Sequence, residues 1–161
     1  MHPYTKRLLG LLGDDDPVAA LERGPERADA LFAAIRPLGF DDAWEPGKWT
    51  GRQIFAHLAA TEVGVGFRLR QSLSEDRHRV QAFDQDAWVA RDGGGDPALA
   101  VAAYKALRAF NLQLIRKLSP EELARPVDHP ERGVESVDLI VRMLAGHDRN
   151  HFAQLERIVR S

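Results

Sequence analysis

Two histidines four positions apart, His147 and His151, are the residues with the clearest capacity for chemistry. They interrupt an apolar stripe with helical spacing, so both rings are expected to face the interior from one helix. Residues four apart lie one above the other on a helix, with Cβ atoms about 5–6 Å apart, and two such imidazoles can bind one metal ion. The pattern therefore predicts a metal site. The stripe consists of Ile140, Leu144, His147, His151, Leu155 and Ile158.

A third histidine, His57, follows Ile54 by three positions at the boundary of another helical stripe. Metal sites in helical bundles are built from facing helices, so His57 can complete a set with His147 and His151. Three protein ligands leave positions open for water or substrate, as in catalytic sites. Imidazole suits zinc, copper, iron and nickel. We expect a divalent transition metal, zinc or nickel first, with iron or manganese as alternatives.

Two other interpretations of these histidines compete with a catalytic metal site. A single inward histidine is most often a core residue that is hydrogen-bonded to a neighbour. Two stacked rings are harder to satisfy in this way, and an unpaired polar group costs about 1–3 kcal/mol. The segment from His147 to His151 also resembles the His-Glu-x-x-His motif of zinc proteases. Asp148 stands where that motif has its general-base glutamate and is one methylene shorter, so a protease is disfavoured.

Two carboxylates lie close to these histidines in the sequence. Glu62 comes five positions after His57, about 140° further round the helix, so it is expected at the edge of the bundle rather than on the metal. Asp148 either orients a ligand imidazole from behind or is solvated. His2, His78 and His129 are expected to be solvated.

Polar and aromatic residues elsewhere allow two interpretations each. The polar residues of the middle loop either form a plain connection or line the mouth of the site, and the tryptophans are expected to act as packing anchors rather than as substrate stackers. These residues are Asp84, Gln85 and Asp86, and Trp44, Trp49 and Trp88.

The composition excludes several classes of function. With 22 Lys and Arg against 24 Asp and Glu, the net charge is −2, which argues against a nucleic-acid or anionic-membrane partner. The absence of cysteine excludes disulfides, thiolate metal sites and a cysteine nucleophile, and is compatible with a reducing cytoplasm. No stretch approaches the roughly 18–20 apolar residues of a membrane span, and the first residues are unlike a signal peptide. We expect a cytoplasmic protein that acts on a small molecule.

The elements that must position the histidines are helices. Glycine and proline divide the chain into helical blocks, and no window has the alternation of a strand. Four long helices imply an all-α, four-helix bundle with short extra helical segments, folded as a single domain over residues 1–161. The expected segments are a short piece over 17–23 that Gly24-Pro25 ends, and helices over 25–39, 50–72, 96–118, 119–122 and 136–160, separated by loops.

Capping signals support these boundaries. Thr50 and Gln53 have the capping-box pattern, and Asp16 and Asp96 each precede a proline at the first helical position. The inward face of the helix over 96–118 is expected to carry Leu99, Ala103, Ala106, Leu107, Phe110 and Leu114.

Two segments resemble the DinB/YfiT-like superfamily of metalloenzymes. They are residues 47–50, which lead into 57–62, and residues 145–151, and the resemblance extends over about residues 15–160. It implies a four-helix bundle with a divalent metal on His57, His147 and His151, and frequently a homodimer. Some members of that superfamily are transferases or isomerases that use a low-molecular-weight thiol such as bacillithiol or mycothiol.

Three functional hypotheses follow. The first is a metal-dependent enzyme whose ion lowers the pKa of a bound water or thiol, or polarises a carbonyl; small-thiol transfer is favoured on the resemblance, and hydrolysis comes next. The second is a non-catalytic, metal-stabilised stress-response module, which a fourth protein ligand such as Glu62 or Asp148 would favour. The third is a bundle whose three core histidines bind no metal. Because the chain has no cysteine, any reacting sulfur must arrive with a small molecule.

Overall fold

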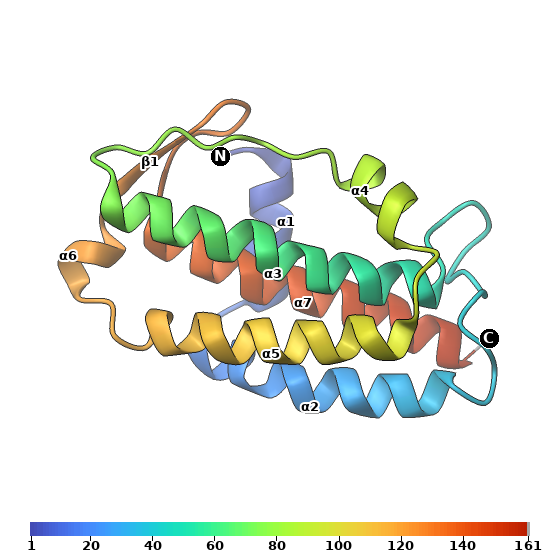
Figure 1. Ribbon diagram of the computed structural model, residues 1–161. Helices are drawn as coiled ribbons and strands as arrows, with labels where there is room; N and C mark the ends of the chain where they lie inside the picture. Colours follow the sequence, from blue (N-terminus) through green and yellow to red (C-terminus); the bar gives the residue numbers. More distant parts are fainter. Residues whose placement is uncertain (161) are drawn as a thin grey trace.

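The computed structural model describes residues 1–160 and consists of seven helices and one short hairpin within that range (Figure 1). The long helices are α2 (Pro17–Ile35), α3 (Gly51–Ser74), α5 (Pro97–Ile115) and α7 (Val137–Arg160). The short elements are α1 (Pro3–Leu12), α4 (Gln85–Asp92), α6 (Pro120–Leu123), β1 (Pro126–His129) and β2 (Gly133–Ser136).

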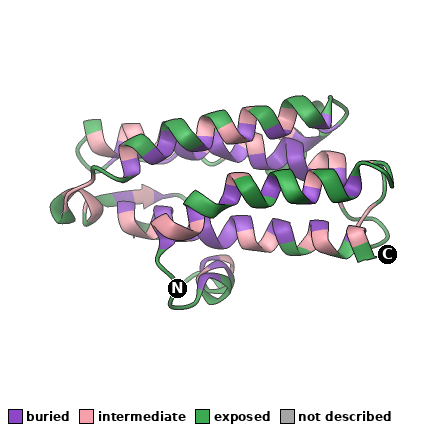
Figure 2. Cartoon of the chain, turned by 90° about the horizontal axis from the view of Figure 1, so that it is seen from below, coloured by how far each residue is buried: buried purple, intermediate pink, exposed green. Residues whose placement is uncertain are grey.

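The four long helices form a bundle, as the sequence predicts. α3 packs against α5 and α7, and α2 packs against the same two helices, so each long helix has two long neighbours. α1 lies against α7 but runs across it rather than along it (Figures 1 and 2). Buried residues follow the faces of the helices that look into the bundle, and exposed residues follow the outer faces (Figure 2). No helix in the described range is long and apolar enough to cross a bilayer.

The predicted helix starts are confirmed by their caps. The Thr50 hydroxyl accepts from the Gln53 amide, and the Gln53 side chain accepts from the Thr50 amide, which completes the capping box. Asp16 and Asp96 cap α2 and α5 with proline at the next position. Ser136 Oγ accepts from the Leu139 amide at the start of α7. These local signals set the lengths of the four helices that bring the histidines together.

The prediction that Gly24-Pro25 ends a helix is wrong, because α2 runs through both residues. Proline lacks the N–H that would bind the carbonyl four residues earlier, which here belongs to Leu21. Arg108 Nη1 of α5 donates to that carbonyl at 3.1 Å instead. A Cβ on Gly24 would lie 2.4 Å from the Tyr104 hydroxyl and 2.7 Å from Arg108 Nη1. The apparent helix breaker is therefore the place where a side chain of another helix docks.

Three short elements were missed by sequence reasoning. α1 lies in the first residues, which carry no strong periodic signal, and α4 lies within the segment 73–95 that was expected to be a loop. The loop expected between α6 and α7 contains an antiparallel hairpin, in which Val127 pairs with Glu135 and His129 with Gly133. Four-residue strands are too short to show an alternating pattern.

The apolar core is divided into two halves by a polar layer. One half contains Leu21, Leu69 and Leu144, and the other contains Leu31, Leu58 and Leu155. The buried residues between the two halves are polar or lack a side chain. They are Gly24 on α2, Thr61 and Glu62 on α3, Arg108 and Asn111 on α5, and Gly146, His147, Asp148 and His151 on α7.

The prediction of which face of α5 points inward is wrong, because the polar layer includes residues of this helix. Leu99 and Phe110 are 69% and 57% exposed. The buried face instead carries Val101, Tyr104, Arg108, Asn111, Leu112 and Ile115. The stripe predicted from apolar residues alone is rotated about the helix axis relative to the buried face. The reason is that three buried positions, Tyr104, Arg108 and Asn111, are polar and bond to residues of α3 and α7.

Gly146 lets α1 approach α7 closely. A Cβ at this position would lie 2.1 Å from the carbonyl oxygen of Leu8 and 2.7 Å from its carbonyl carbon, both in the backbone of α1. We expect Gly146→Ala to lower the free energy of unfolding by about 1–3 kcal/mol, as overpacking does. Urea denaturation measures the loss. The matched control is Gly10→Ala, because a Cβ at Gly10 meets nothing within 4 Å; equal stability of the two variants would contradict the account.

Candidate metal centre

The three histidines predicted to bind a metal lie together in the structure. One ring nitrogen of each of His57, His147 and His151 lies within 4.8 Å of the other two. His57 Nε2 is 2.8 Å from His147 Nε2, and His151 Nε2 is 3.1 Å from the same atom. All three side chains are buried. α3 supplies the first, and one face of α7 supplies the other two.

The separation of these nitrogens fits one shared ion. Two imidazole nitrogens at tetrahedral positions, each about 2.0–2.1 Å from zinc, lie roughly 3.3 Å apart. The Nε2 atoms need only a small outward movement to reach that separation. Neutral imidazoles fit each other less well, because each nitrogen either donates or accepts one hydrogen bond. His147 Nε2 faces two other ring nitrogens and cannot bond fully to both.

The hydrogen bond of the other ring nitrogen of His151 also favours a ligand role for that residue, whereas His147 has no such bond among the described residues. His151 Nδ1 lies 2.7 Å from Gln154 Oε1, which can only accept, so this ring carries its proton on Nδ1. The lone pair of His151 Nε2 is then directed at the other two rings, an arrangement typical of metal-binding histidines. His147 Nδ1 is the one buried side-chain nitrogen or oxygen that lacks a hydrogen bond in the described range.

Burial holds the three rings in the neutral form. Loss of solvent lowers the pKa of His57 to about 3, with a further contribution from His151. Burial likewise lowers the pKa of His151 to about 4, against a raising effect of its bond to Gln154. The pKa of His147 is also well below its usual value because of burial and both neighbouring histidines. Neutral imidazole is the form that binds a metal.

These pKa values predict how the metal-free protein responds to acid. Between pH 6.5 and the lowered pKa of His57, the unfolded chain binds a proton that the folded chain excludes, so stability falls as the pH falls. In the presence of a chelator, lowering the pH from 6.5 to 5.5 is expected to cost about 1 kcal/mol for each such histidine, because the unfolded ring is only half protonated at the start of this range. Urea denaturation of the wild type and His57→Gln measures this. The same pH dependence in both proteins would contradict the account.

A tryptophan restrains the histidine rings from one side. The Trp49 ring is stacked over His151, with centroids 6.0 Å apart and an interplanar angle of 17°. Its centroid is also 4.7 Å from that of His57. Trp49 and Trp44 pack against the core, and Trp88 stacks on Phe83 with centroids 4.5 Å apart. All three tryptophans therefore pack against neighbouring side chains, as predicted. Trp44 and Trp49 also line the second cavity, so their separation from substrate stays a prediction, and Trp49 limits the rotation of two candidate ligands.

A buried ion-pair network lies beside the histidines and was missed by sequence reasoning. The guanidinium of Arg108 is fully buried and donates to Glu62 Oε1 at 2.6 Å and to Asp148 Oδ2 at 2.6 Å. With further bonds to the same carboxylates and to the Leu21 carbonyl, Arg108 makes five hydrogen bonds, as many as a guanidinium has N–H donors. The network joins all four long helices at the level of the histidines.

The two carboxylates therefore occupy places that the sequence did not predict. Glu62 was expected at the edge of the bundle and is 1% exposed; Asn111 Nδ2 also donates to it, at 2.9 Å. Asp148 is 3% exposed and accepts from the Tyr104 hydroxyl at 2.8 Å, so it is neither solvated nor bound to a histidine. Burial is the largest cause that raises the pKa of Tyr104, and the charge of Asp148 is the next. The Tyr104 hydroxyl therefore stays protonated and acts as a donor.

Glycine at two positions makes room for this network. A Cβ on Gly66 would lie 2.6 Å from Asn111 Oδ1, just as one on Gly24 would meet Tyr104 and Arg108. Burial alone would lower the pKa of Arg108. The neighbouring Asp148, Tyr104 and Glu62 outweigh this effect and raise the pKa above its usual value. The sequence does contain a signal for the network, since Tyr104 and Arg108 are four apart on the stripe that includes Val101 and Ile115.

Two cavities adjoin the histidine cluster and reach different members of it. The first, of about 330 Å³, reaches His57 and His147, and the second, of about 390 Å³, reaches His151. Tyr4 and Gln85 line both cavities. Burial raises the pKa of the Tyr4 phenol, so its hydroxyl stays protonated at neutral pH and can donate a hydrogen bond there.

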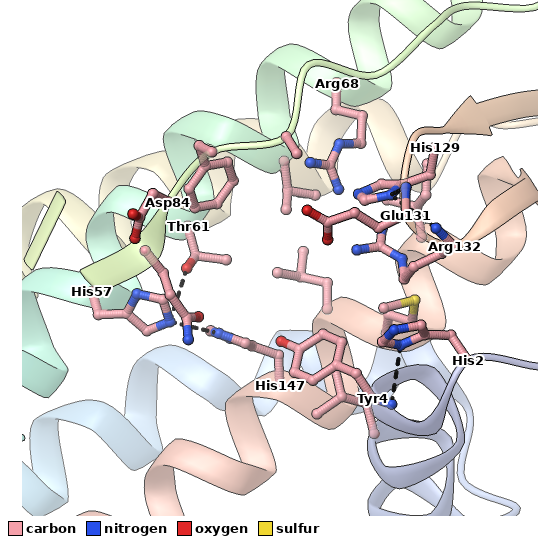
Figure 3. Close-up of a pocket in the computed structure, with 18 residues that line it drawn as sticks. His2, Tyr4, His57, Thr61, Arg68, Asp84, His129, Glu131, Arg132 and His147 are labelled. Carbon is pink, nitrogen blue, oxygen red and sulfur yellow. Dashed lines mark hydrogen bonds between the residues drawn. The ribbon is translucent and has the colours of Figure 1, made fainter. Parts of the chain in front are cut away.

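The first cavity extends from the two histidines to the hairpin. Figure 3 shows His57, Thr61 and His147 at one end and Arg68, His129 and Arg132 at the other. Asp84 caps α4 and, with Gln85, lines the cavity, so these residues lie at the site and are not only a polar connection; Asp86 lines the second cavity. Phe83 packs where Gly64 has no side chain, since a Cβ there would be 2.9 Å from Phe83 Cε1.

The three histidines outside the cluster have structural partners. His2 is exposed as predicted, and its Nδ1 accepts from the Tyr4 amide at the start of α1. The prediction that His78 and His129 are solvated is wrong, because they are 9% and 5% exposed. His78 Nδ1 lies 2.6 Å from Glu75 Oε2, and His129 Nδ1 accepts backbone amides of the hairpin turn. His129 is the last residue of β1, and the His78 carbonyl accepts from the Asp128 amide of the same strand, so both depend on a hairpin that the sequence did not predict.

Comparisons with known proteins agree on the family and the fold. A model of the DinB superfamily matches residues 20–155. YfiT of Bacillus subtilis, named as a candidate metal-dependent hydrolase, is 23% identical over 149 residues, which cover 91% of this chain and 84% of YfiT. OB0782 of Oceanobacillus iheyensis carries the same description and is 28% identical over 116 residues, 71% of this chain and 67% of that protein.

Two solved structures share the architecture. The structure of YfiT, which has a four-helix bundle of unusual topology, superposes with a TM-score of 0.84 at 23% identity and covers 89% of this chain and 84% of that one. A mycothiol-dependent maleylpyruvate isomerase superposes with a TM-score of 0.72 at 13% identity. The match covers 96% of this chain but only 63% of the isomerase. These likenesses establish the fold as a four-helix bundle of this kind.

Proposed function

Because the chain belongs to the DinB superfamily, we propose that it is a divalent-metal-dependent enzyme acting on a small molecule, with His57, His147 and His151 as the metal ligands. The observation that carries this proposal is the convergence of three buried Nε2 atoms on one point at the wall of a cavity. A bound divalent ion would lower the pKa of a water or thiol, or polarise a carbonyl. Zinc and nickel suit imidazole ligands, and iron or manganese are the alternatives.

The protein's own residues prepare this centre. Gln154 fixes the tautomer of His151, and Trp49 restrains the rings of His151 and His57. Burial keeps the three imidazoles neutral and ready to bind without losing a proton. Tyr4 lines both cavities with a protonated hydroxyl that can donate a hydrogen bond to a substrate oxygen.

A catalytic role is favoured over a purely structural metal by the two carboxylates. A closed structural site needs a fourth protein ligand, and Glu62 and Asp148 are the acidic residues nearest to the histidines in the sequence. Both are held by Arg108 instead, at 2.6 Å each. Three protein ligands next to a cavity leave room for a substrate or water on the ion.

Two reactions fit the site, and a different observation favours each. The presence of two cavities that reach different histidines of the cluster favours a reaction between two small molecules, such as addition or transfer of a low-molecular-weight thiol. The mycothiol-dependent isomerase of the same fold supports this reaction. Hydrolysis, in which water is the second reactant, is supported by the names of the relatives.

Reconstitution separates these reactions. We expect chelator-treated protein to be inactive and to regain activity with zinc, nickel, iron or manganese, measured either on a small thiol with an electrophile or on a panel of nitrophenyl esters. His57→Ala should abolish the activity, whereas His78→Ala should keep it, since His78 lines neither cavity. Equal activity of the two variants, or activity that persists after metal removal, would contradict the proposal.

We also propose that the chain functions as a homodimer in the cytoplasm and as a single domain. Exposed apolar side chains on the neighbouring helices α3 and α5 support an interface between copies: Phe67 is 61% exposed and Phe110 is 57% exposed. The guanidinium carbon of Arg70 lies 4.5 Å from the centroid of the Phe110 ring. Because Arg70 is about one turn after Phe67 on α3, the two exposed phenylalanines lie on the same side of the bundle. A net charge of −2 favours a small-molecule substrate over nucleic acid.

A further inference from the structure

The end of the first cavity remote from His57 and His147 contains an arginine that forms no ion pair within residues 1–160. Arg68 projects from α3 into this end of the cavity (Figure 3). Its guanidinium makes no ion pair or hydrogen bond with any residue in the described range, whereas the neighbouring Arg132 is paired with Glu135 through Nε and Nη2. Desolvation and the charge of Arg132 lower the pKa of Arg68, and the opposing effects of Glu135 and Tyr4 are smaller. A half-buried arginine in this position is stabilised by an anion more than by solvent.

A second donor stands at the same end. His129 lines the cavity, and its Nδ1 accepts from the Glu131 and Arg132 amides at 3.2 and 3.3 Å. A nitrogen that accepts carries no proton, and burial lowers the pKa of this ring, so the proton of neutral His129 sits on Nε2. Arg68 and His129 thus provide hydrogen-bond donors from two different elements.

We propose that this end of the cavity recognises a carboxylate of the substrate and that Arg68 is the residue that binds it. The inference rests on the proposed function, since it places the reacting end of the same molecule at His57 and His147. A guanidinium binds a carboxylate through two parallel N–H···O bonds.

The charge around Arg68 favours a monoanion. Glu131 also lines this end of the cavity, and Glu135 already neutralises Arg132. Arg68 is the one cation at this end without an ion pair in the described range, so it can compensate one negative charge of a ligand. The second charge of a phosphate dianion would lie near Glu131 without a cation, and the repulsion would be larger than for a monoanion.

The wall between the two ends is largely apolar, and its side chains come from α1, α3, α7 and the segment before α4. The cavity of about 330 Å³ is at the small end of the range for ligand sites, roughly 300–1,000 Å³. The substrate class is therefore a small monocarboxylate with an apolar middle and a reactive group at the opposite end. The apolar side chains are Leu8, Val65, Phe83, Ile140, Met143 and Leu144.

Calorimetric titration with ω-mercaptoalkanoic acids of increasing chain length, and with their primary amides, tests this inference. The sulfur serves as the metal-directed end and the carboxylate as the Arg68-directed end. We expect the acid of best length to bind the wild type about tenfold more tightly than its amide, the effect of one charged hydrogen-bonding partner. Arg68→Gln should remove this preference and Arg68→Lys should keep part of it. Arg91→Gln, an exposed residue outside both cavities, should leave it unchanged.

The same titrations with zinc-loaded and chelator-treated protein separate this inference from the metal site. A preference for acid over amide that depends on Arg68 but is indifferent to zinc would support the carboxylate site and argue against the metal. Zinc-dependent binding of thiols with no preference between acid and amide would overturn the carboxylate site alone. A preference that persists in Arg68→Gln, with the melting temperature unchanged, would also overturn it.

Discussion

Replacement of Arg108 by methionine is expected to lower the free energy of unfolding by about 3–5 kcal/mol, the usual effect of removing one member of a buried ion pair. The guanidinium has no exposed surface and is the shared partner of Glu62 and Asp148. Methionine fills much of the volume but leaves both carboxylates in the interior without their cation. Urea denaturation at neutral pH measures the loss.

Two further variants make this result specific. Arg116→Met removes an arginine of the same helix region that is 52% exposed and paired with Glu22, and it should cost no more than about 1 kcal/mol. Combining Arg108→Met with Glu62→Gln and Asp148→Asn should restore part of the loss, because no uncompensated charge remains. If Arg108→Met were as stable as Arg116→Met, the polar layer would not be holding the bundle together.

Metal binding is expected to have a stabilising effect of similar size. An ion that binds only the folded chain raises the free energy of unfolding by about 4 kcal/mol when the free ion concentration is about 1,000 times its Kd. Thermal and urea denaturation with zinc or with a chelator should differ accordingly. The variant His147→Ala/His151→Ala should show no difference, and His78→Ala should respond like the wild type. A zinc response that persists in the double variant would place the ion elsewhere.

The bundle was predictable because its signals are local. Each long helix but the last begins at a signal that spans a few residues. Asp16 and Asp96 are each followed by a proline, and Thr50 forms a capping box. The histidines at positions 147 and 151 share a helix face by spacing alone, so their proximity needs no knowledge of the tertiary structure. The approach of His57 follows once two helices of a bundle are assumed to face each other.

The polar layer was not predictable by the same reasoning because each of its members violates a local rule. Glu62 was expected at the edge of the bundle, and Arg108 is a charged residue on a predicted helix, yet each is the buried partner of the other. Gly24-Pro25 has the form of a helix end, and only the docking of Arg108 on the Leu21 carbonyl explains why the helix continues. Hydrogen-bond partners on different helices cannot be predicted from the pattern of each helix considered separately.

The cavities depend on elements with weak signals. α1 supplies Tyr4, α4 begins next to Asp84 and Gln85, and the hairpin places His129 and Arg132. The sequence indicated that the middle loop, with Asp84 and Gln85, could line the mouth of the site. It could not indicate that the hairpin forms the opposite end of the same cavity.

The metal content of the purified protein tests the central claim most directly. Elemental analysis after dialysis against zinc, followed by removal of free ion, should find about one divalent ion per wild-type chain. The same measurement should find none in His147→Ala/His151→Ala and a full complement in His78→Ala. A wild-type chain without bound ion, or a double variant with as much ion as the wild type, would contradict the assignment of His57, His147 and His151 as a metal centre.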